Sequence, residues 1–195
     1  GIYQVIRSKA PTMIRRWRQR YFLIGPYNAQ KAAVEFEERR PSGWMGRVLE
    51  KLAAEGLKVH HGRWLIPGRP KVLLVEHAVG EHELGVQKYR LWEDHRIETP
   101  GGAASNWFID GTVSFGDACR RLIAEIGHEW IRSAHPEGTA HLGAITHPED
   151  DESDASPRGG RDRRLLVHAH EWMAGLCIPA LRHRHADIPV ATIFT

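Results

Sequence analysis

The sequence predicts an α/β protein with a Rossmann-like, mostly parallel sheet. Short apolar runs of β type alternate with segments of helical periodicity, and the last three runs are almost continuously apolar. Such runs are typical of strands that are covered on both faces. Because strands separated by helices are joined by right-handed crossovers, a mostly parallel sheet follows. The runs lie at 20–25, 70–77, 163–170 and 188–195.

Helical periodicity is clearest in three segments. Apolar residues recur at helical spacing over 44–52, and a second stripe over 115–126 ends near Gly127. A third helix is predicted from 171 to 184, with a kink at Pro179, because proline removes a backbone donor and its ring collides with the preceding turn. In sheets of this kind ligands bind beyond the carboxyl ends of the strands. Candidate site residues are therefore expected directly after the predicted strands.

Two segments show neither helical nor strand periodicity. Residues 146–164 carry Asp and Glu first and Arg afterwards, together with Pro, Ser and Gly, which predicts a mobile surface insertion. Residues 98–106 predict a second, shorter loop. Within 61–76, the apolar group 64–66 lies between two glycines and predicts a tight connection with an apolar plug, followed by a strand.

The composition is that of an ordinary globular protein. Apolar residues make up 42% and charged residues 26% of the 195 residues. No window approaches the roughly 18–20 uninterrupted apolar residues that a membrane span needs, so no membrane is expected. Cys119 and Cys177 both fall in apolar helical patterns, which predicts reduced, buried thiols and a cytoplasmic protein.

Positive charge is concentrated near the beginning of the sequence. Six Lys and Arg residues lie within the first twenty positions, although the formal net charge is only +3. Such a run is most often a solvated face, and the functional alternatives are phosphate, nucleic acid or the diphosphate of a nucleotide sugar. No interleaved aromatic and basic platform accompanies the charge, so no nucleic-acid partner is expected.

Both ends of the sequence predict an internal piece of a longer protein. The sequence begins with GIYQVI, without a methionine or a signal peptide. It stops at Thr195 within the apolar β-type run PVATIFT, where no polar residue ends the strand.

His168 and His170 are the first candidates for chemistry. Two histidines at this spacing on a strand point the same way and can present two imidazoles to one metal ion. A third ligand is required, and Glu171 would point to the opposite face of a continuing strand. The alternative, polar residues at a strand end that bond to neighbouring backbone, is therefore favoured. A metal-dependent hydrolase built on the two histidines is the rival hypothesis.

Other catalytic motifs are absent from the sequence. Neither cysteine lies in a polar context that would lower the pKa of its thiol. No G-x-S-x-G elbow, Walker A loop or complete G-x-G-x-x-G fingerprint is present. Gly1 is compatible with the end of a glycine-rich turn, where backbone N–H groups approach a phosphate ahead of a helix.

Five segments, taken together, resemble one family. They are GIYQVIRSKAPT (1–12), YFLIGPYN (21–28), GRWLIPGRPKVLL (62–74), HAHEWMAG (168–175) and PVATIFT (189–195). In this order they look like the successive landmarks of the animal and fungal type of glycogen synthase. The segments 29–60 and 77–160 match poorly.

The resemblance implies a retaining glucosyltransferase of the GT-B kind, which has two Rossmann-like domains. Such an enzyme moves glucose from UDP-glucose to the 4-hydroxyl at a non-reducing end of an α-1,4-glucan, in glycogen biosynthesis. Residues 1–195 would be a partial N-terminal domain, truncated at both ends and inactive without the C-terminal domain. The resemblance implies no cofactor and no metal, because helix N-termini and cationic side chains stabilise the departing diphosphate. A homo-oligomer is compatible with it.

The resemblance also implies two groups of site residues. The donor-phosphate loop would comprise Gly1, Ile2 and Tyr3. The cleft edge would comprise His168, His170, Glu171 and Trp172. The histidine and arginine that contact the donor in the family would follow Thr195, so no catalytic residue is expected within the chain.

Ala169 departs from the family's pattern, which has an aromatic residue between the two histidines. Related bacterial synthases also show alanine there. Another GT-B glucosyltransferase, such as an ADP-glucose-dependent starch synthase, is therefore the nearest alternative.

Overall fold

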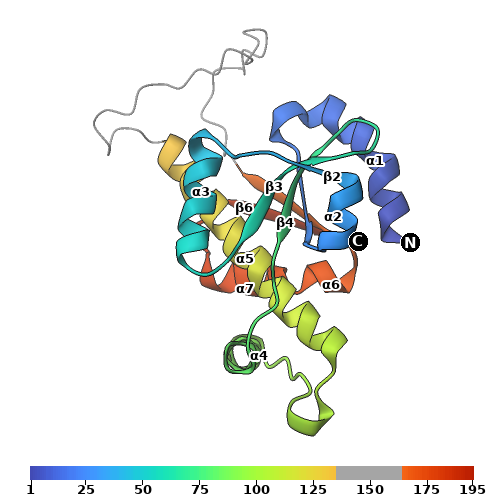
Figure 1. Ribbon diagram of the computed structural model, residues 1–195. Helices are drawn as coiled ribbons and strands as arrows, with labels where there is room; N and C mark the ends of the chain where they lie inside the picture. Colours follow the sequence, from blue (N-terminus) through green and yellow to red (C-terminus); the bar gives the residue numbers. More distant parts are fainter. Residues whose placement is uncertain (135–163) are drawn as a thin grey trace.

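The computed structural model describes residues 1–134 and 164–195, which form an α/β structure with two sheets (Figure 1). The elements follow one another as α1 (Ile2–Trp17), η1 (Arg18–Arg20), β1 (Phe22–Pro26), α2 (Ala29–Glu35), β2 (Phe36–Glu38), α3 (Gly43–Ala54), β3 (Val59–Trp64), β4 (Lys71–Val75), α4 (Glu81–His95), η2 (Gly102–Ala104), α5 (Trp107–Ala134), β5 (Leu165–Ala169), α6 (Glu171–Gly175), α7 (Cys177–Arg184) and β6 (Val190–Phe194). Apart from Arg164, the insertion predicted over 146–164 lies outside the described residues.

The strand pairing confirms the α/β class and corrects the predicted sheet. The larger sheet has the order β1-β4-β3-β2, and β5 pairs with β6 in a smaller one. β1 and β4 are parallel, as are β5 and β6, so all four predicted strands are confirmed. β3, however, is antiparallel to both β4 and β2. A mostly parallel sheet is therefore the wrong description of the β2–β3–β4 part.

The antiparallel pairing follows from the short connection between β3 and β4. Residues 65–70 join the two strands without a helix, and a connection this short permits only a hairpin. Gly68 and Arg69 adopt positive φ angles of 88° and 44° there, and Ile66 is buried as the predicted apolar plug. Residues 61–64, predicted to belong to the connection, lie in β3 instead.

Helix α5 is longer than the sequence predicts. The predicted helix over 44–52 is confirmed as α3, but the stripe over 115–126 belongs to a helix of 28 residues that continues past Gly127. A Cβ atom at Gly127 would lie only 2.3 Å from Cγ2 of Ile188. The glycine therefore serves close packing of the chain after α7 against α5, and it does not end the helix.

The third predicted helix is divided at Leu176 into α6 and α7. Pro179 lies in the first turn of α7, where its missing N–H leaves no helical hydrogen bond unmade. In one continuous helix its ring would collide with the carbonyl of Gly175. The predicted kink at Pro179 thus takes the form of a break before it.

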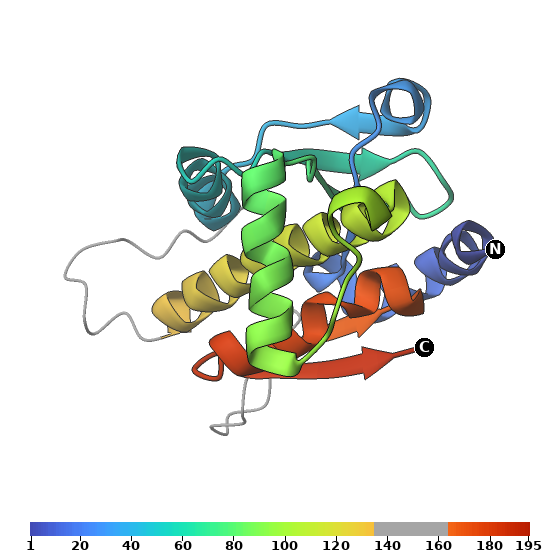
Figure 2. The same cartoon turned by 90° about the horizontal axis from the view of Figure 1, so that it is seen from below.

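Helix α5 contributes to two apolar clusters. Leu122 packs in the cluster that α5 shares with α3 and β4, whereas Ile123 packs with α7 and Ile188. Figure 2 shows α5 between the larger sheet and β6. Cys119 and Cys177 are buried, free thiols in the second cluster, as predicted, and burial raises the pKa of Cys177 to about 11. Neither α5 nor any other helix among the described residues has the length and apolar character needed to cross a membrane.

Truncation of Leu122 tests this core. Its side chain is fully buried, so we expect Leu122→Ala to lower the free energy of unfolding by about 2–5 kcal/mol, through lost apolar contact and a residual cavity. Guanidinium denaturation measures the change. Val34, which is 75% exposed on α2, provides the control, and Val34→Ala should cost less than about 0.5 kcal/mol. Equal losses for the two variants would contradict this core.

Candidate functional site

The carboxyl ends of β5 and β6 bring His168 and His170 together with Thr195. The two strands are parallel, with Ala169 opposite Phe194, so Thr195 follows β6 beside the end of β5. Thr195 Oγ1 lies 3.0 Å from His168 Nε2 and 3.1 Å from His170 Nδ1. One hydroxyl therefore connects both imidazoles, whose ring centroids are 4.0 Å apart. We call these three residues the histidine–threonine group.

The contacts within the histidine–threonine group are compatible with two neutral imidazoles. A hydroxyl donates one hydrogen bond and accepts others, so one ring can accept from Thr195 while the other donates to it. Partial burial, followed by the charge of Lys9, lowers the pKa of His168. The pKa of His170 is lowered by partial burial, then by His168 and Lys9. Both rings therefore stay neutral at a lower pH than an ordinary histidine does.

Glu171 turns the chain from β5 into α6, as predicted. Its φ angle of +64° lies in the left-handed region, and its N–H donates to the Thr195 carbonyl at 2.7 Å. His170 is the N-cap residue of α6. Because Glu171 is exposed at this turn, its backbone rather than its carboxylate holds the end of β5 against Thr195.

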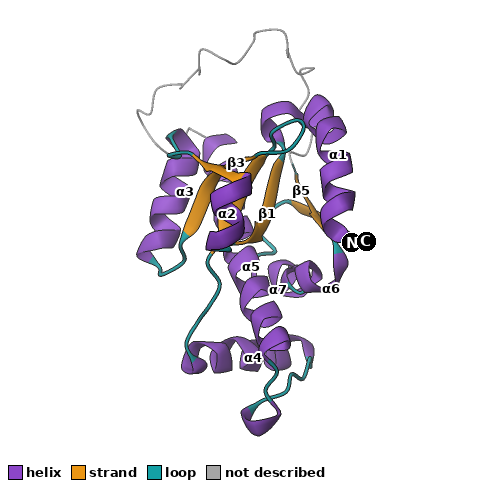
Figure 3. Ribbon diagram, turned by 45° about the vertical axis from the view of Figure 1, so that its right-hand side comes forward, coloured by secondary structure: helices purple, strands orange, loops and turns teal. Residues whose placement is uncertain are grey.

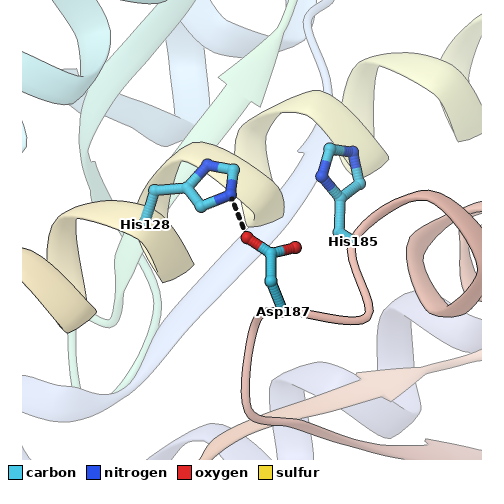
Figure 4. Close-up of side chains that lie close together, drawn as sticks. All are labelled: His128, His185 and Asp187. Atoms are coloured by element: carbon cyan, nitrogen blue, oxygen red, sulfur yellow. Dashed lines mark hydrogen bonds and ion pairs between the residues drawn. The ribbon is translucent and has the colours of Figure 1, made fainter.

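Within the described residues, the two histidines of β5 belong to no group of three potential metal ligands. Among the described residues, the one group of three potential ligands comprises His128, His185 and Asp187, whose ligand atoms lie within 4.8 Å of one another (Figure 4). His128 Nε2 donates to Asp187 Oδ2 at 3.1 Å. Arg120 Nη1 donates to His185 Nε2 at 2.8 Å, and this guanidinium charge would oppose a cation beside it.

A large cavity connects the predicted phosphate loop with the cleft edge. Ile2 of α1 lines this cavity, and so do His168 and His170. Lys9, two turns further along α1, lines it too and supplies the positive charge that both imidazoles sense. The structure therefore brings part of the predicted loop to the same cavity as the histidines.

Gly1 and Tyr3 take other positions. Gly1 is the N-cap residue of α1, so a helix follows it directly. Tyr3 contacts α2 and the larger sheet: its hydroxyl donates to Glu35 Oε1 of α2 at 3.2 Å, and its ring meets Trp64 of β3 edge-on at 5.2 Å between centroids. The predicted loop is thus divided between the cavity and the larger sheet.

Trp172 belongs to an exposed aromatic cluster that it forms with Trp107 and Phe108. The ring centroids of Trp172 and Phe108 are 5.4 Å apart, and those of Phe108 and Trp107 are 5.8 Å apart. Trp107 is 84% exposed and Trp172 51% exposed. The sequence singles out Trp172 alone, because its two aromatic neighbours lie far away along the chain and become adjacent only through folding.

A polar cluster that the sequence does not single out surrounds His60 on β3. The imidazole is buried, with Nδ1 2.8 Å from Glu38 Oε1 and Nε2 2.8 Å from Glu76 Oε1. Its ring stacks on Tyr27 at 3.8 Å between centroids. Hydrogen bonds from Lys58 and then from His60 lower the pKa of Glu76. The sequence held one signal for this cluster: Tyr27 and Glu76 lie near the ends of two predicted strands and directly follow β1 and β4, where polar site residues are expected.

The comparisons with known proteins agree with the resemblance. The model of the family described as "Glycogen synthase" matches residues 1–133. Over its whole length the chain is 31% identical to "Glycogen [starch] synthase" of Dictyostelium discoideum, 32% to that of Neurospora crassa, and 29% to "Glycogen [starch] synthase, liver" of Homo sapiens. The chain spans 18%, 23% and 23% of the lengths of these relatives, respectively.

Removal of the Lys9 charge tests the electrostatics of the histidine–threonine group. Because that charge disfavours imidazolium, we expect Lys9→Gln to raise the pKa of both His168 and His170. NMR titration of the imidazole resonances measures both pKa values. Lys31→Gln on α2 removes an equal charge elsewhere and should leave them unchanged. Identical titration curves for Lys9→Gln and the unaltered protein would refute the assignment.

Proposed function

Because the chain belongs to the glycogen synthase family, we propose that it forms part of the N-terminal domain of a retaining GT-B glucosyltransferase. In this proposal the complete gene product transfers glucose from UDP-glucose to the 4-hydroxyl at a non-reducing end of an α-1,4-glucan. The observation that carries the proposal is the family match over residues 1–133. No metal or cofactor is assigned to the reaction.

The position and chemistry of the histidine–threonine group support a role at the edge of the sugar-nucleotide cleft. Ligands of open α/β sheets bind beyond the carboxyl ends of parallel strands, where this group lies. Neutral imidazole and hydroxyl groups both donate and accept hydrogen bonds, which matches the hydroxyls of a sugar. Lys9 beside them offers a positive charge that suits the phosphates of a nucleotide-sugar donor.

The exposed aromatic cluster supports a glucan partner. Aromatic rings present large, rigid apolar surfaces, and the faces of glucose rings are flat and partly apolar. Trp172 follows β5 directly, so the cluster and the histidine–threonine group lie at the same end of that strand. A glucan chain laid over the cluster would thus approach the proposed cleft.

The proposal predicts activity only when both domains are present. Purified residues 1–195 should show no glucosyl transfer, because the groups that bind and activate the donor are shared between two domains. The complete gene product should release UDP from UDP-glucose when glycogen is the acceptor. Turnover by the 195-residue chain would sink the shared-site proposal. A complete product that uses ADP-glucose and ignores UDP-glucose would favour the starch synthase alternative.

Trp172→Ala tests the glucan surface. We expect the complete gene product carrying this change to bind glycogen about two- to tenfold more weakly, since an aromatic contact contributes about 0.5–1.5 kcal/mol. Half-saturating glycogen concentration is the measured quantity. Trp92, 42% exposed on α4 and outside the cluster, supplies the matched variant Trp92→Ala, which should bind normally. Equal weakening in both variants would argue against the cluster as the binding surface.

A further inference from the structure

A small cavity lies where α4 packs across α5 and α7 (Figure 3). Its volume is about 30 Å³, whereas a buried water molecule requires roughly 10–15 Å³. Residues of these three helices and Leu176 form its walls. The cavity therefore has room for one or two molecules of the size of water, and it is far too small for a sugar or a nucleotide.

Gln87 of α4 brings an amide oxygen without a protein partner to this cavity. The side chain lines the cavity, and the residue is only 5% exposed. Among the described residues, no N–H or O–H group donates to its buried Oε1. Buried polar atoms of native proteins are nearly always bonded, either to protein or to ordered water, because an unmet acceptor is costly. Gln87 therefore requires a donor inside the cavity.

His95 presents a second atom of this kind from the last turn of the same helix. Its Nε2 is buried without a hydrogen-bond partner in the part of the chain that the structure describes, and His95 lines the same cavity. A neutral imidazole has one donor and one acceptor nitrogen. Because water both donates and accepts, it can bond to Nε2 in either tautomer, and it can donate to the Gln87 oxygen as well.

The charges around the cavity are paired with one another, which favours an uncharged occupant. Arg184 donates to the two oxygens of Asp94 at 2.6 and 2.9 Å. Arg120 donates to Asp117 Oδ1 at 3.0 and 2.8 Å. All four side chains line the cavity. A cation would be repelled by the guanidinium groups, whereas an anion such as chloride could not donate to the amide oxygen of Gln87.

The helices around the cavity are held in place and cannot close it. A Cβ atom at Gly116 of α5 would lie 3.2 Å from Leu176 Cβ and 3.5 Å from Cys177 N, so α5 and the start of α7 are already in close contact. The ion pair of Arg184 with Asp94 joins α7 to α4. Gln87 and Leu91 are the buried residues of α4, so apolar contact contributes little to its docking.

We propose that α4 docks on α5 and α7 through an internal water site. One or two water molecules donate to Gln87 Oε1 and bond to His95 Nε2, so the centre of this three-helix contact is polar and hydrated. The bound water replaces the hydrogen bonds that both atoms lose on burial. The inference does not rest on the proposed glucosyl transfer.

A crystal structure of the complete gene product, at a resolution that shows ordered water, tests the site directly. We expect a water molecule about 2.7–3.2 Å from Gln87 Oε1, and the same or a second molecule at this distance from His95 Nε2. The absence of water from either atom would overturn the proposal. A metal ion, chloride or a protein side chain in the cavity would overturn it equally.

Oxygen-17 relaxation dispersion provides a second test, in solution. It counts water molecules that remain in a protein for longer than its tumbling time. Gln87→Met keeps a side chain of similar length but removes the amide, so the count should fall by about one or two. Gln30→Met makes the same change at an exposed position of α2 and should leave the count unaltered. Equal counts for the two variants would contradict an internal water bonded to Gln87.

Discussion

Burial of α5 on two sides is the constraint on which the rest of the structure depends. Ala118 and Leu122 face α3 and β4, whereas Cys119 and Ile123 face α7. Successive helical residues point about 100° apart, so two adjacent stripes of this kind create a wide apolar surface. A helix with one narrow stripe would support only one of the two sheets. Each cluster therefore orients one set of parallel strands, and α5 sets their relative position.

The same helix carries two buried carboxylates, which restrict how α3 can dock. Burial raises the pKa of Glu125 and Glu129, but hydrogen bonds from Lys51, Arg47 and Arg132 outweigh it, so both pKa values are lowered. A buried carboxylate that lost a cationic partner would be strongly destabilising. α3 supplies Arg47 and Lys51, so apolar packing alone does not fix its position: its cations must also reach α5.

The sequence predicts elements that owe their form to local pattern and misses those that owe it to partners. Continuous apolar runs identify β1, β4, β5 and β6, but His60 and Gly62 interrupt the pattern of β3, whose stability comes from its neighbours on both edges. Gly127 has the local character of a helix end, and only the approach of Ile188 explains it. The histidines of the site could be located because they end an apolar run. Their bonds to Thr195 depend on the β5–β6 register, which no local pattern specifies.

His168 links the pairing of β5 and β6 to the chemistry of the site. Its side chain bonds to Thr195 across to β6, while its backbone groups point to the opposite edge of β5. The contacts of both imidazoles with the Thr195 hydroxyl restrict their rotation. Hydrogen-bonding groups contribute most to recognition when neighbouring structure fixes their geometry before the ligand arrives. The pairing of β5 with β6 thus organises the histidine–threonine group, because it places the Thr195 hydroxyl where both imidazoles can reach it.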